Sequence, residues 1–377
     1  MATVRIEGGR VLSPEGLAVR ELHLAEGRIV EHAGSAPDAV VDARGLLVLP
    51  GAVDLHGDAF ERELAPRPGV RFDPALALAE VDRRLIGCGI TTAYHALTVG
   101  WEPGLRSPEA AAEVVAAIRA ARARAAADAR LHLRWEVFAE DARARVLDWL
   151  AGEDAPILAF NDHLTNLMTG GHMVRKAGAN AARAGLTAEG YAALCERLWA
   201  RREETGAWIE EMAARARAAG ATLLAHDEDA PETRARFRAL GARASEFPLT
   251  EAAAEAARAA GEAVILGAPN VLRGGSHNGA ISAAEAVEAG LCTVLASDYW
   301  HPSLAAAPFA LARRGVDFAA AWRLVSEGPA AAAGLADRGR LAPGLRADVL
   351  LVDDAGDWPE VVSVRVAGRE VLRRRAA

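Results

Sequence analysis

Cysteine and lysine are scarce in this sequence, and long apolar runs are missing. Its three cysteines, Cys88, Cys195 and Cys292, are far apart and follow no metal-finger spacing. This pattern predicts reduced thiols and a cytoplasmic protein. No stretch is long enough to cross a bilayer, and the N-terminal segment MATVRIEGGR lacks an apolar signal core. These absences argue against a disulfide-rich secreted protein and against a membrane protein.

The balance of charge is acidic, with a formal net charge of −8 at pH 7. An excess of negative charge argues against nucleic acid or an anionic membrane as the main partner. It leaves a small anionic substrate open, because local arginines or a metal ion can outweigh the overall charge. Lysine occurs once, at Lys176, so arginine supplies nearly all of the positive charge. We expect a small-molecule substrate and a homo-oligomeric protein.

The length of 377 residues, of which 51% are hydrophobic and 25% charged, suits one large α/β domain with a small accessory domain. Short alternating runs broken by glycine and proline fill residues 3–49, and similar runs return near the C-terminus as ADVLLVDD and VVSVRVAGREVLRR. Both ends therefore predict β-strands. We expect them to pair as a small β-sandwich domain of residues 1–50 plus 336–377, beside a main domain of residues 51–335.

Between these ends, apolar segments typical of strands alternate with alanine-rich helical segments. The predicted strands cover 52–57, 91–97, 131–138, 155–161, 221–226, 243–247, 263–268 and 292–297. The predicted helices cover 107–127, 187–219, 231–240, 251–260 and 281–289. Eight strands alternating with helices favour a TIM-like (β/α)₈ barrel. A doubly wound open sheet is less favoured, because no glycine-rich phosphate-binding fingerprint follows the first strand.

Histidines and carboxylates occur at the C-terminal ends of five predicted strands. In a barrel these ends form one ring, so residues distant in sequence converge there. A single such residue is more often a capping or hydrogen-bonding group, but five strand ends with the same chemistry indicate a metal site. Imidazole and carboxylate ligands suit Zn²⁺, with Mn²⁺ or Fe²⁺ as alternatives, and one or two ions are expected. The residues are His56, Asp58, Glu136, Asp162, His163, His226, Asp227 and Asp298.

The remaining histidines are not expected to take part in this site. His23, His32 and His132 are expected at the surface or in strand packing, away from the C-terminal ends of the strands. His95 lies inside a predicted strand and is expected to be buried and neutral.

A series of motifs resembles the amidohydrolase superfamily and, within it, the PhnM family of phosphonate-metabolism diphosphatases. They are PGAVDLHGD, GITTAYHAL, LAFNDHL, LLAHDEDA, SEFPLTEAA, GAPNVLRGGSHNG and ASDYWHPSL. The resemblance covers nearly the whole chain, and GAPNVLRGGSHNG and the block HGD to ERELAPRPGV are its specific parts. It implies a metal-dependent (β/α)₈ hydrolase that releases pyrophosphate from α-D-ribose 1-methylphosphonate 5-triphosphate.

The resemblance also implies roles for individual residues. It makes His56, Asp58, His163, His226 and Asp298 metal ligands, with Asp298 also the general base. Many superfamily members bridge two metals with a carboxylated lysine, but Lys176 is not at a strand end, so Glu136 is the better candidate for a bridge. Glu136 and His163 fall on the third and fourth predicted strands, one earlier than the superfamily pattern. Either the strand count is off by one or the ligand set differs.

Phosphate recognition is predicted for arginines near the motifs, because a guanidinium binds phosphate through two hydrogen bonds. The candidates are Arg62, Arg67 and Arg273, with Ser276 and His277 beside the last. An ordinary surface ion pair is the alternative for each arginine.

Three functions are compared: hydrolysis of a phosphoanhydride, hydrolysis of an amide or cyclic amide, and binding without catalysis. The RGGSHNG and PRPG motifs favour the first. The presence of all proposed ligands argues against the third. The segment LTNLMTGGH, which begins directly after His163 and departs from the family pattern, keeps the second open.

Overall fold

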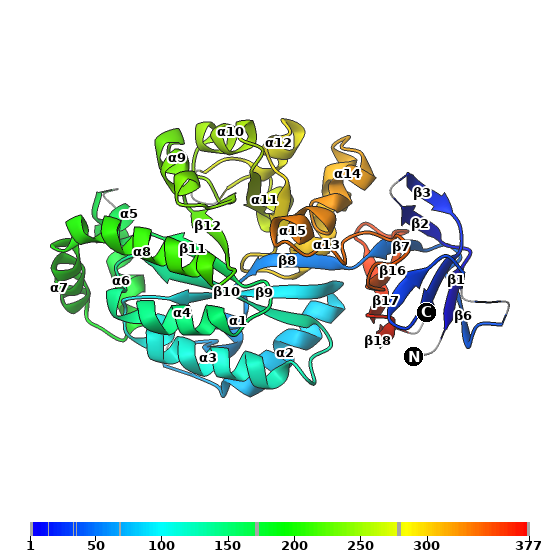
Figure 1. Cartoon of the computed structure of the whole chain (residues 1–377), viewed down its shortest axis with the longest axis horizontal. Helices are drawn as coiled ribbons and strands as arrows, with labels where there is room; N and C mark the ends of the chain where they lie inside the picture. Colours follow the sequence, from blue (N-terminus) through cyan, green and yellow to red (C-terminus); the bar gives the residue numbers. More distant parts are fainter. Residues whose placement is uncertain are drawn as a thin grey trace.

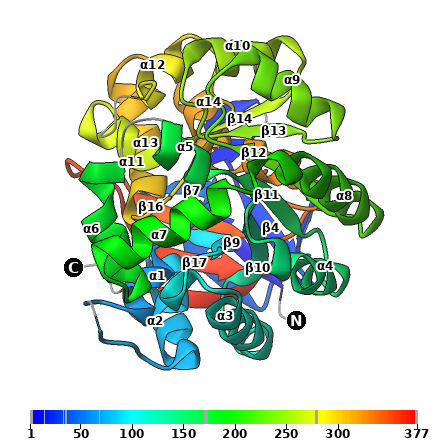
Figure 2. The same ribbon diagram turned by 90° about the vertical axis from the view of Figure 1, so that its left-hand side faces the viewer.

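The computed structural model describes residues 3–13, 15–32, 34, 36–67, 69–169, 173–276 and 280–374, with the backbone alone for 173–177. In this part of the chain, eight parallel strands follow one another around a barrel with helices on its outside (Figures 1 and 2). They are β8 (Ala52–Gly57), β9 (Ile90–Val99), β10 (Asp128–Glu136), β11 (Ile157–Asn161), β12 (Thr222–His226), β13 (Ala244–Glu246), β14 (Ala263–Gly267) and β15 (Val294–Ala296). Each predicted strand matches one of these, so the predicted barrel is confirmed.

The barrel closes where the end of β8 meets the chain that follows β15. The Asp58 amide donates to the Asp298 carbonyl at 2.9 Å, and the Asp298 amide donates to the His56 carbonyl at 2.8 Å. This close approach requires glycine at position 57, because a Cβ atom on Gly57 would lie 2.7 Å from the Asp54 carboxylate. The closure therefore also places Asp58 beside Asp298, two residues predicted to bind metal.

The interior of the barrel is an apolar core rather than a channel. Alternate residues of each strand face inward, and they include Leu55, Tyr94, Ile157, Leu224 and Ile265, all fully buried. The opposite face of the strands packs against the helices in a larger core. Polar side chains at the C-terminal ends of the strands consequently lie next to a closely packed apolar core.

The helices follow the strands in the alternation that the sequence predicts. They include α2 (Pro74–Gly87), α3 (Pro108–Ala121), α4 (Arg143–Ala151), α6 (Met173–Ala184), α9 (Pro231–Ala239), α10 (Glu251–Ala259), α12 (Ala283–Glu288), α13 (Pro302–Arg313), α14 (Phe318–Arg323) and α15 (Glu327–Ala332). Ser107 caps α3 by accepting from the Ala110 amide at 3.2 Å. Among the described residues, no helix combines the length and the apolar character needed to span a bilayer.

One predicted helix, 187–219, is wrong as a single element. It divides into α7 (Ala188–Trp199), a 3₁₀ turn at Arg202–Glu204, and α8 (Thr205–Ala218). No glycine or proline lies between the two helices, so their continuous hydrophobic periodicity predicted a single helix. The predicted start is right, since Thr187 caps α7 by accepting from the Gly190 amide at 3.1 Å.

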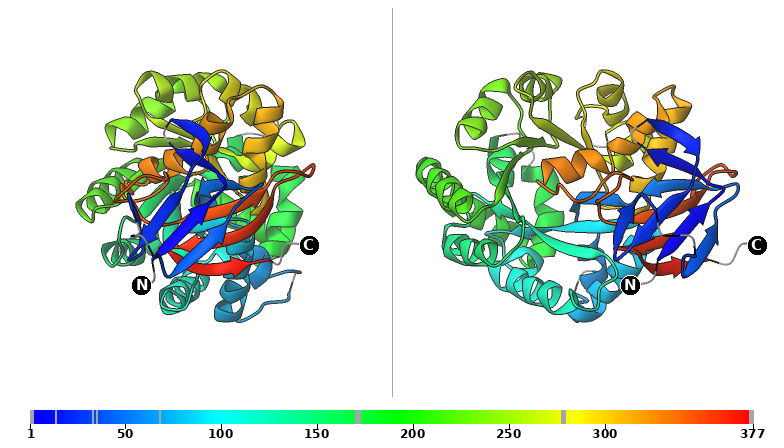
Figure 3. Two further views of the ribbon diagram at one scale, coloured as in Figure 1. Left: turned by 90° about the vertical axis from the view of Figure 1, so that its right-hand side faces the viewer. Right: turned by 45° about the vertical axis from the view of Figure 1, so that its right-hand side comes forward.

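Strands from both ends of the chain form two mixed sheets beside the barrel (Figure 3). One has the order β5-β4-β1-β6 and the other β18-β17-β16-β7-β2-β3. Their bounds are β1 (Val4–Glu7), β2 (Arg10–Ser13), β3 (Gly16–Val19), β4 (Leu22–Ala25), β5 (Arg28–Val30), β6 (Ala39–Asp42), β7 (Leu47–Pro50), β16 (Val349–Asp353), β17 (Glu360–Val366) and β18 (Arg369–Arg373).

The two terminal sheets share one apolar core, which joins Ile6 and Leu24 of the first sheet to Val48 and Val349 of the second. Strand β7 from the N-terminal part pairs with β16 from the C-terminal part. The prediction that both ends build these sheets together is confirmed. The domain limits of 1–50 plus 336–377 and of 51–335 stay a prediction.

Candidate metal centre

Among the described residues, three overlapping groups of histidine and carboxylate side chains lie at the C-terminal ends of the barrel strands. Within each group, the ligand atoms lie within 4.8 Å of one another. The groups are His56, Asp58 and Asp298; His163, His226 and Asp227; and His56, His226 and Glu246. His56 and His226 each belong to two groups, so the three form one continuous site. The structure thus brings together His56, Asp58, His163, His226 and Asp298, as the sequence analysis expected of metal ligands.

His56, at the end of β8, is held in place by a carboxylate from another strand. Its Nδ1 atom lies 2.8 Å from Oε1 of Glu246, which ends β13. This hydrogen bond orients the ring and leaves Nε2 as the nitrogen available to a metal. Burial, followed by the nearby Arg134 charge, holds the pKa of His56 well below its usual value. The ring is therefore neutral, which is the form that binds metals.

His163 begins the short helix α5 (His163–Thr169) directly after β11. Its Nδ1 atom pairs with the Glu136 carboxylate, and its Nε2 atom lies 3.5 Å from Oδ2 of Asp227. The same Asp227 oxygen lies 3.1 Å from Nδ1 of His226. Burial opposes a charge on His163, but Glu136 and Asp227 outweigh it and raise the pKa of His163 to about 9. A metal ion that binds this ring must therefore displace a proton from it. Asp162 lies apart from these contacts and accepts from the Thr165 amide at 2.9 Å, at the start of α5.

Glu136 lies behind His163 rather than within one of the three groups. Besides the ring contact, its carboxylate accepts from the His163 backbone amide at 3.3 Å. The Glu136 side chain is almost fully buried, with 3% of its surface exposed. A carboxylate in this position orients a ligand histidine. Direct metal binding by Glu136 stays a prediction.

Three residues at the site have backbone conformations in the left-handed region. Asp227, Phe247 and Asp298 have φ angles of 58°, 51° and 55°. Such angles are strained for residues other than glycine and collect at functional sites. Hydrogen bonds between strands hold them, as in the 2.9 Å bond from the Asp227 amide to the Glu246 carbonyl.

The chemistry of this set fits a divalent cation. Burial, and then repulsion from Asp58, raises the pKa of Asp298 to about 7, and burial also raises the pKa of Asp58. A cation would relieve the repulsion between these two carboxylates.

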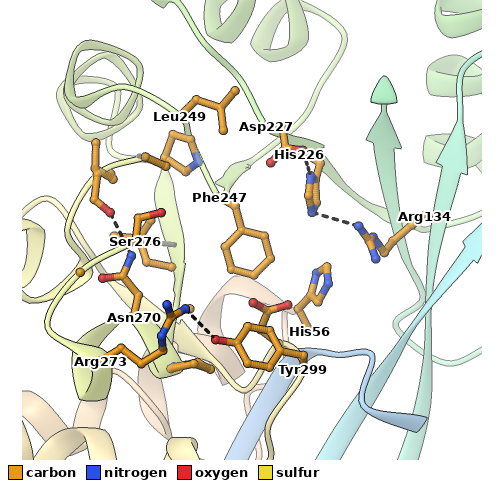
Figure 4. A pocket seen from close by; sticks show the side chains of 18 residues that line it. His56, Arg134, His226, Asp227, Phe247, Leu249, Asn270, Arg273, Ser276 and Tyr299 are labelled. Atoms are coloured by element: carbon orange, nitrogen blue, oxygen red, sulfur yellow. Dashed lines mark hydrogen bonds and ion pairs between the residues drawn. The ribbon is translucent and has the colours of Figure 1, made fainter. Parts of the chain in front are cut away.

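A pocket of about 180 Å³ opens above these residues (Figure 4). His56, His226, Asp227 and Asp298 line one part of it, and the Phe247 ring packs against those of His56 and His226, with centroids 4.9 and 5.3 Å away. The pocket is therefore continuous with the candidate metal centre.

The predicted substrate-binding residues divide around this pocket. Arg273, at the end of α11 (Ala268–Arg273), and Ser276 line it, and Arg273 donates to the Tyr299 hydroxyl at 3.3 Å. Arg62 is exposed on α1 (Phe60–Leu64), with its guanidinium 5.6 Å from the Tyr299 ring centroid. Arg67 is exposed and is not among the described lining residues. His277 lies outside the described residues.

With this geometry in place, sequence comparison identifies the family. No family model matches the chain. It is 31% identical over 351 residues to alpha-D-ribose 1-methylphosphonate 5-triphosphate diphosphatase of Escherichia coli (strain K12), a match that covers 89% of this chain and 90% of that protein. The chain belongs to the family of this diphosphatase, within the amidohydrolase superfamily.

Solved structures of the superfamily share the fold of this diphosphatase family member. One amidohydrolase matches with a TM-score of 0.66 and 15% identity over 99% of both chains. The β-aspartyl dipeptidase of Fervidobacterium islandicum AW-1 matches with a TM-score of 0.63 and 17% identity, over 98% of this chain and 97% of that one.

The strand positions of Glu136 and His163 answer a question that the sequence left open. Glu136 ends β10, the third barrel strand, and His163 follows β11, the fourth. The strand count from the sequence was therefore right, and a ligand set that differs from the superfamily pattern stays a prediction. Lys176 lies within α6 rather than at a strand end, as expected.

Three polar residues of the site were missed or misplaced. His132 was expected away from the site, but it is fully buried, its ring lies 5.2 Å from that of His56, and its Nε2 atom is 3.6 Å from Oε2 of Glu246. Arg134 lines the pocket. Both share a strand face with Glu136 by simple alternation, which would have placed them. Glu246 is next to last in the predicted strand 243–247, so a search around the strand ends could have found it.

Proposed function

We propose that the protein is a metal-dependent diphosphatase that releases pyrophosphate from α-D-ribose 1-methylphosphonate 5-triphosphate in phosphonate catabolism. The observation that carries this proposal is the meeting, in one pocket, of the histidine and carboxylate groups with the guanidinium of Arg273. Family membership supports the same reaction. Hydrolysis of an amide, the alternative from the sequence, needs no cation at the rim of the pocket.

One or two divalent ions, zinc first, would be held by His56, Asp58, His163, His226 and Asp298. A bound divalent ion supplies a water of lowered pKa and offsets negative charge on phosphoryl oxygens. Asp298 lies beside Asp58 at the pocket wall, where its carboxylate can accept the proton of the attacking water. The water oxygen then bonds to phosphorus, and the leaving pyrophosphate keeps the electron pair of the broken P–O bond.

Substrate binding is assigned to the opposite side of the pocket. Arg273 and Ser276 would hold phosphate oxygens by charge-assisted and neutral hydrogen bonds. Arg62, Arg67 and His277 remain predicted contributors, and Arg62 is connected to the pocket through Tyr299. The free cysteines Cys88, Cys195 and Cys292 suit a reducing compartment, so we propose a cytoplasmic enzyme. A homo-oligomer stays a prediction.

Replacing Arg273 with methionine tests the rim of this pocket. Methionine keeps much of the apolar stem but removes the charged fork. Charge-assisted hydrogen bonds contribute about 1.5–3 kcal/mol, so kcat/KM on the triphosphate should fall about tenfold or more. The control is Arg314→Met, which removes an exposed arginine paired with Glu288 on the outside of the barrel. Equal losses in both variants would show that Arg273 is structural. Arg67→Met, measured beside them, tests the remaining loop arginine.

The variant Glu136→Gln tests the support of His163. We expect metal affinity to fall about 10- to 100-fold, because the ring loses the carboxylate that orients it. The measurement is metal content by mass spectrometry after dialysis against a weak chelator. The control is Glu140→Gln, a half-buried glutamate that pairs with Arg143 away from the three ligand groups. Repeating the change in a His163→Ala background separates the two roles. No additional loss means that Glu136 acts through His163, and a further loss means that it binds metal itself.

A substrate panel tests the reaction class. The metal-loaded protein is offered the ribose triphosphate, a nucleoside triphosphate, a dipeptide and a cyclic amide, and kcat/KM is determined for each. We expect the highest value for the ribose triphosphate. Hydrolysis of an amide with greater kcat/KM than either phosphoanhydride would contradict the proposed function.

A further inference from the structure

Arg134 of β10 is a buried arginine at the base of the pocket. Its guanidinium lies between two strand ends, with Nη1 3.5 Å from Oδ2 of Asp58 and Nη2 3.3 Å from Nε2 of His226. Only 5% of its surface is exposed, yet it lines the pocket together with His56 and Asp298 (Figure 4). A permanent cation therefore stands within the candidate metal centre itself, where the attacked atom of a substrate would lie.

The contacts of Arg134 are long compared with those of a structural arginine in the same barrel. Arg234, which is fully buried, places Nη1 3.1 Å from both carboxylate oxygens of Glu228 and donates to the Ala242 carbonyl at 2.8 Å. Arg134 has neither a bidentate carboxylate nor a contact of this length among the described residues. The Nε atoms of both arginines are buried without a hydrogen-bond partner there, but that of Arg234 lies 3.0 Å from Oε2 of Glu262. A guanidinium has five N–H donors. Unmet donors on a buried cation indicate an anion that the pocket is built to receive.

The position of Arg134 relative to Arg273 specifies which part of the substrate it would meet. Arg273 belongs to α11 at the rim, whereas Arg134 projects from β10 beside His226 on the other side of the pocket (Figure 4). Arg134 contacts Asp58 and His226, which belong to the candidate ligand groups, whereas Arg273 contacts Tyr299. The group that is attacked must lie near the base that accepts the proton of water, so it lies near Arg134.

We infer that Arg134 is a catalytic residue of the proposed phosphoanhydride hydrolysis, whose guanidinium binds the oxygens of the attacked phosphoryl group. This inference rests on the proposed function and adds a residue to it. As the bond from water to phosphorus forms and the bond to pyrophosphate breaks, negative charge is redistributed over these oxygens. A fixed cation already in place stabilises that charge without rearranging.

The test compares Arg134→Met and Arg134→Lys with Arg130→Met in metal-loaded protein. Arg130 is a matched control. It lies four residues before Arg134 on β10, so its side chain is on the same face of the strand but at the opposite end of the barrel. It is similarly buried and pairs with Asp128 at 3.0 Å. Three quantities are measured for each protein: kcat and KM on the ribose triphosphate, binding of inorganic phosphate by calorimetry, and metal content by mass spectrometry. Thermal unfolding confirms that each variant is folded.

For Arg134→Met we expect kcat to fall about a hundredfold or more with unchanged metal content. Phosphate binding should weaken about tenfold. Arg134→Lys should recover part of kcat, because it keeps the positive charge but not the planar guanidinium group. If Arg134→Met does not fold, the kcat of Arg134→Lys is the measurement that tests the inference. Arg130→Met should keep both kcat and phosphate binding.

Two results would overturn the inference. One is a kcat within about threefold of wild type for Arg134→Met. The other is loss of metal in both Arg134 variants in step with activity, which would make Arg134 only the counterion of Asp58. Failure of the proposed function is separate and visible in the wild type, which would then release no pyrophosphate. In that event the phosphate titration still tests whether Arg134 forms an anion site. Such a site requires that the wild type binds phosphate and that Arg134→Met does not.

Discussion

Asp298→Asn is expected to lower kcat about a thousandfold while the protein stays folded and binds its substrate. A positioned general base contributes about 10²- to 10⁴-fold, and the amide of asparagine cannot accept the proton of the attacking water. Asparagine is the informative choice because Asp298 has a φ angle of 55°, a conformation that asparagine adopts at lower cost than alanine. The measurement is kcat on the ribose triphosphate, with metal content determined on the same sample.

The control for Asp298→Asn is Asp317→Asn. Asp317 caps α14, where its carboxylate accepts from the Ala320 amide at 2.8 Å, and asparagine caps a helix about as well. This control should keep full activity. A kcat for Asp298→Asn within about tenfold of wild type would remove Asp298 from the role of base. Loss of metal together with activity would instead mean that Asp298 acts as a metal ligand and not as the base.

His226→Ala is expected to abolish both metal binding and turnover. His226 belongs to two of the three ligand groups, so its loss affects more of the site than the loss of Asp58 or His163. Removing metal from the wild type with a strong chelator should have the same effect, because the water then keeps its ordinary pKa. Adding zinc, manganese or iron should restore activity to the chelated wild type and not to the variant.

The comparison for His226→Ala is His23→Gln, a histidine of the terminal sheet on β4. This variant should keep its metal and its kcat. Activity that survives in fully metal-depleted wild type would contradict the account of the site. So would a His226→Ala protein that retains the wild-type metal content.

The barrel, and the meeting of the candidate ligands at the C-terminal ends of its strands, could be predicted because both depend on local patterns. Apolar runs such as LLAH at 223–226 end in polar residues, and parallel strands bring their C-terminal ends to one ring. His56 and Asp298, distant in sequence, could be placed together on that ground alone. The paired terminal strands followed from their alternation in the same way.

Other parts of the site depend on contacts that a linear pattern does not contain. The role of Glu246 toward His56 follows from packing of β13 against β8 across the barrel, at 2.8 Å between Nδ1 and Oε1. The pairing of Glu136 with His163 depends on the turn into α5, which the periodicity did not predict. His132 was expected away from the C-terminal ends of the strands, but the barrel brings its ring within 5.2 Å of that of His56.

The central claim, that the protein is a diphosphatase, is tested most directly by following phosphorus NMR of the ribose triphosphate during turnover in water labelled with oxygen-18. The account predicts pyrophosphate without label and a ribose 5-phosphate product that carries one oxygen-18, because water attacks the phosphorus nearest the sugar. Release of single phosphate would contradict the diphosphatase assignment. Oxygen-18 found in pyrophosphate would contradict attack on the phosphorus nearest the sugar.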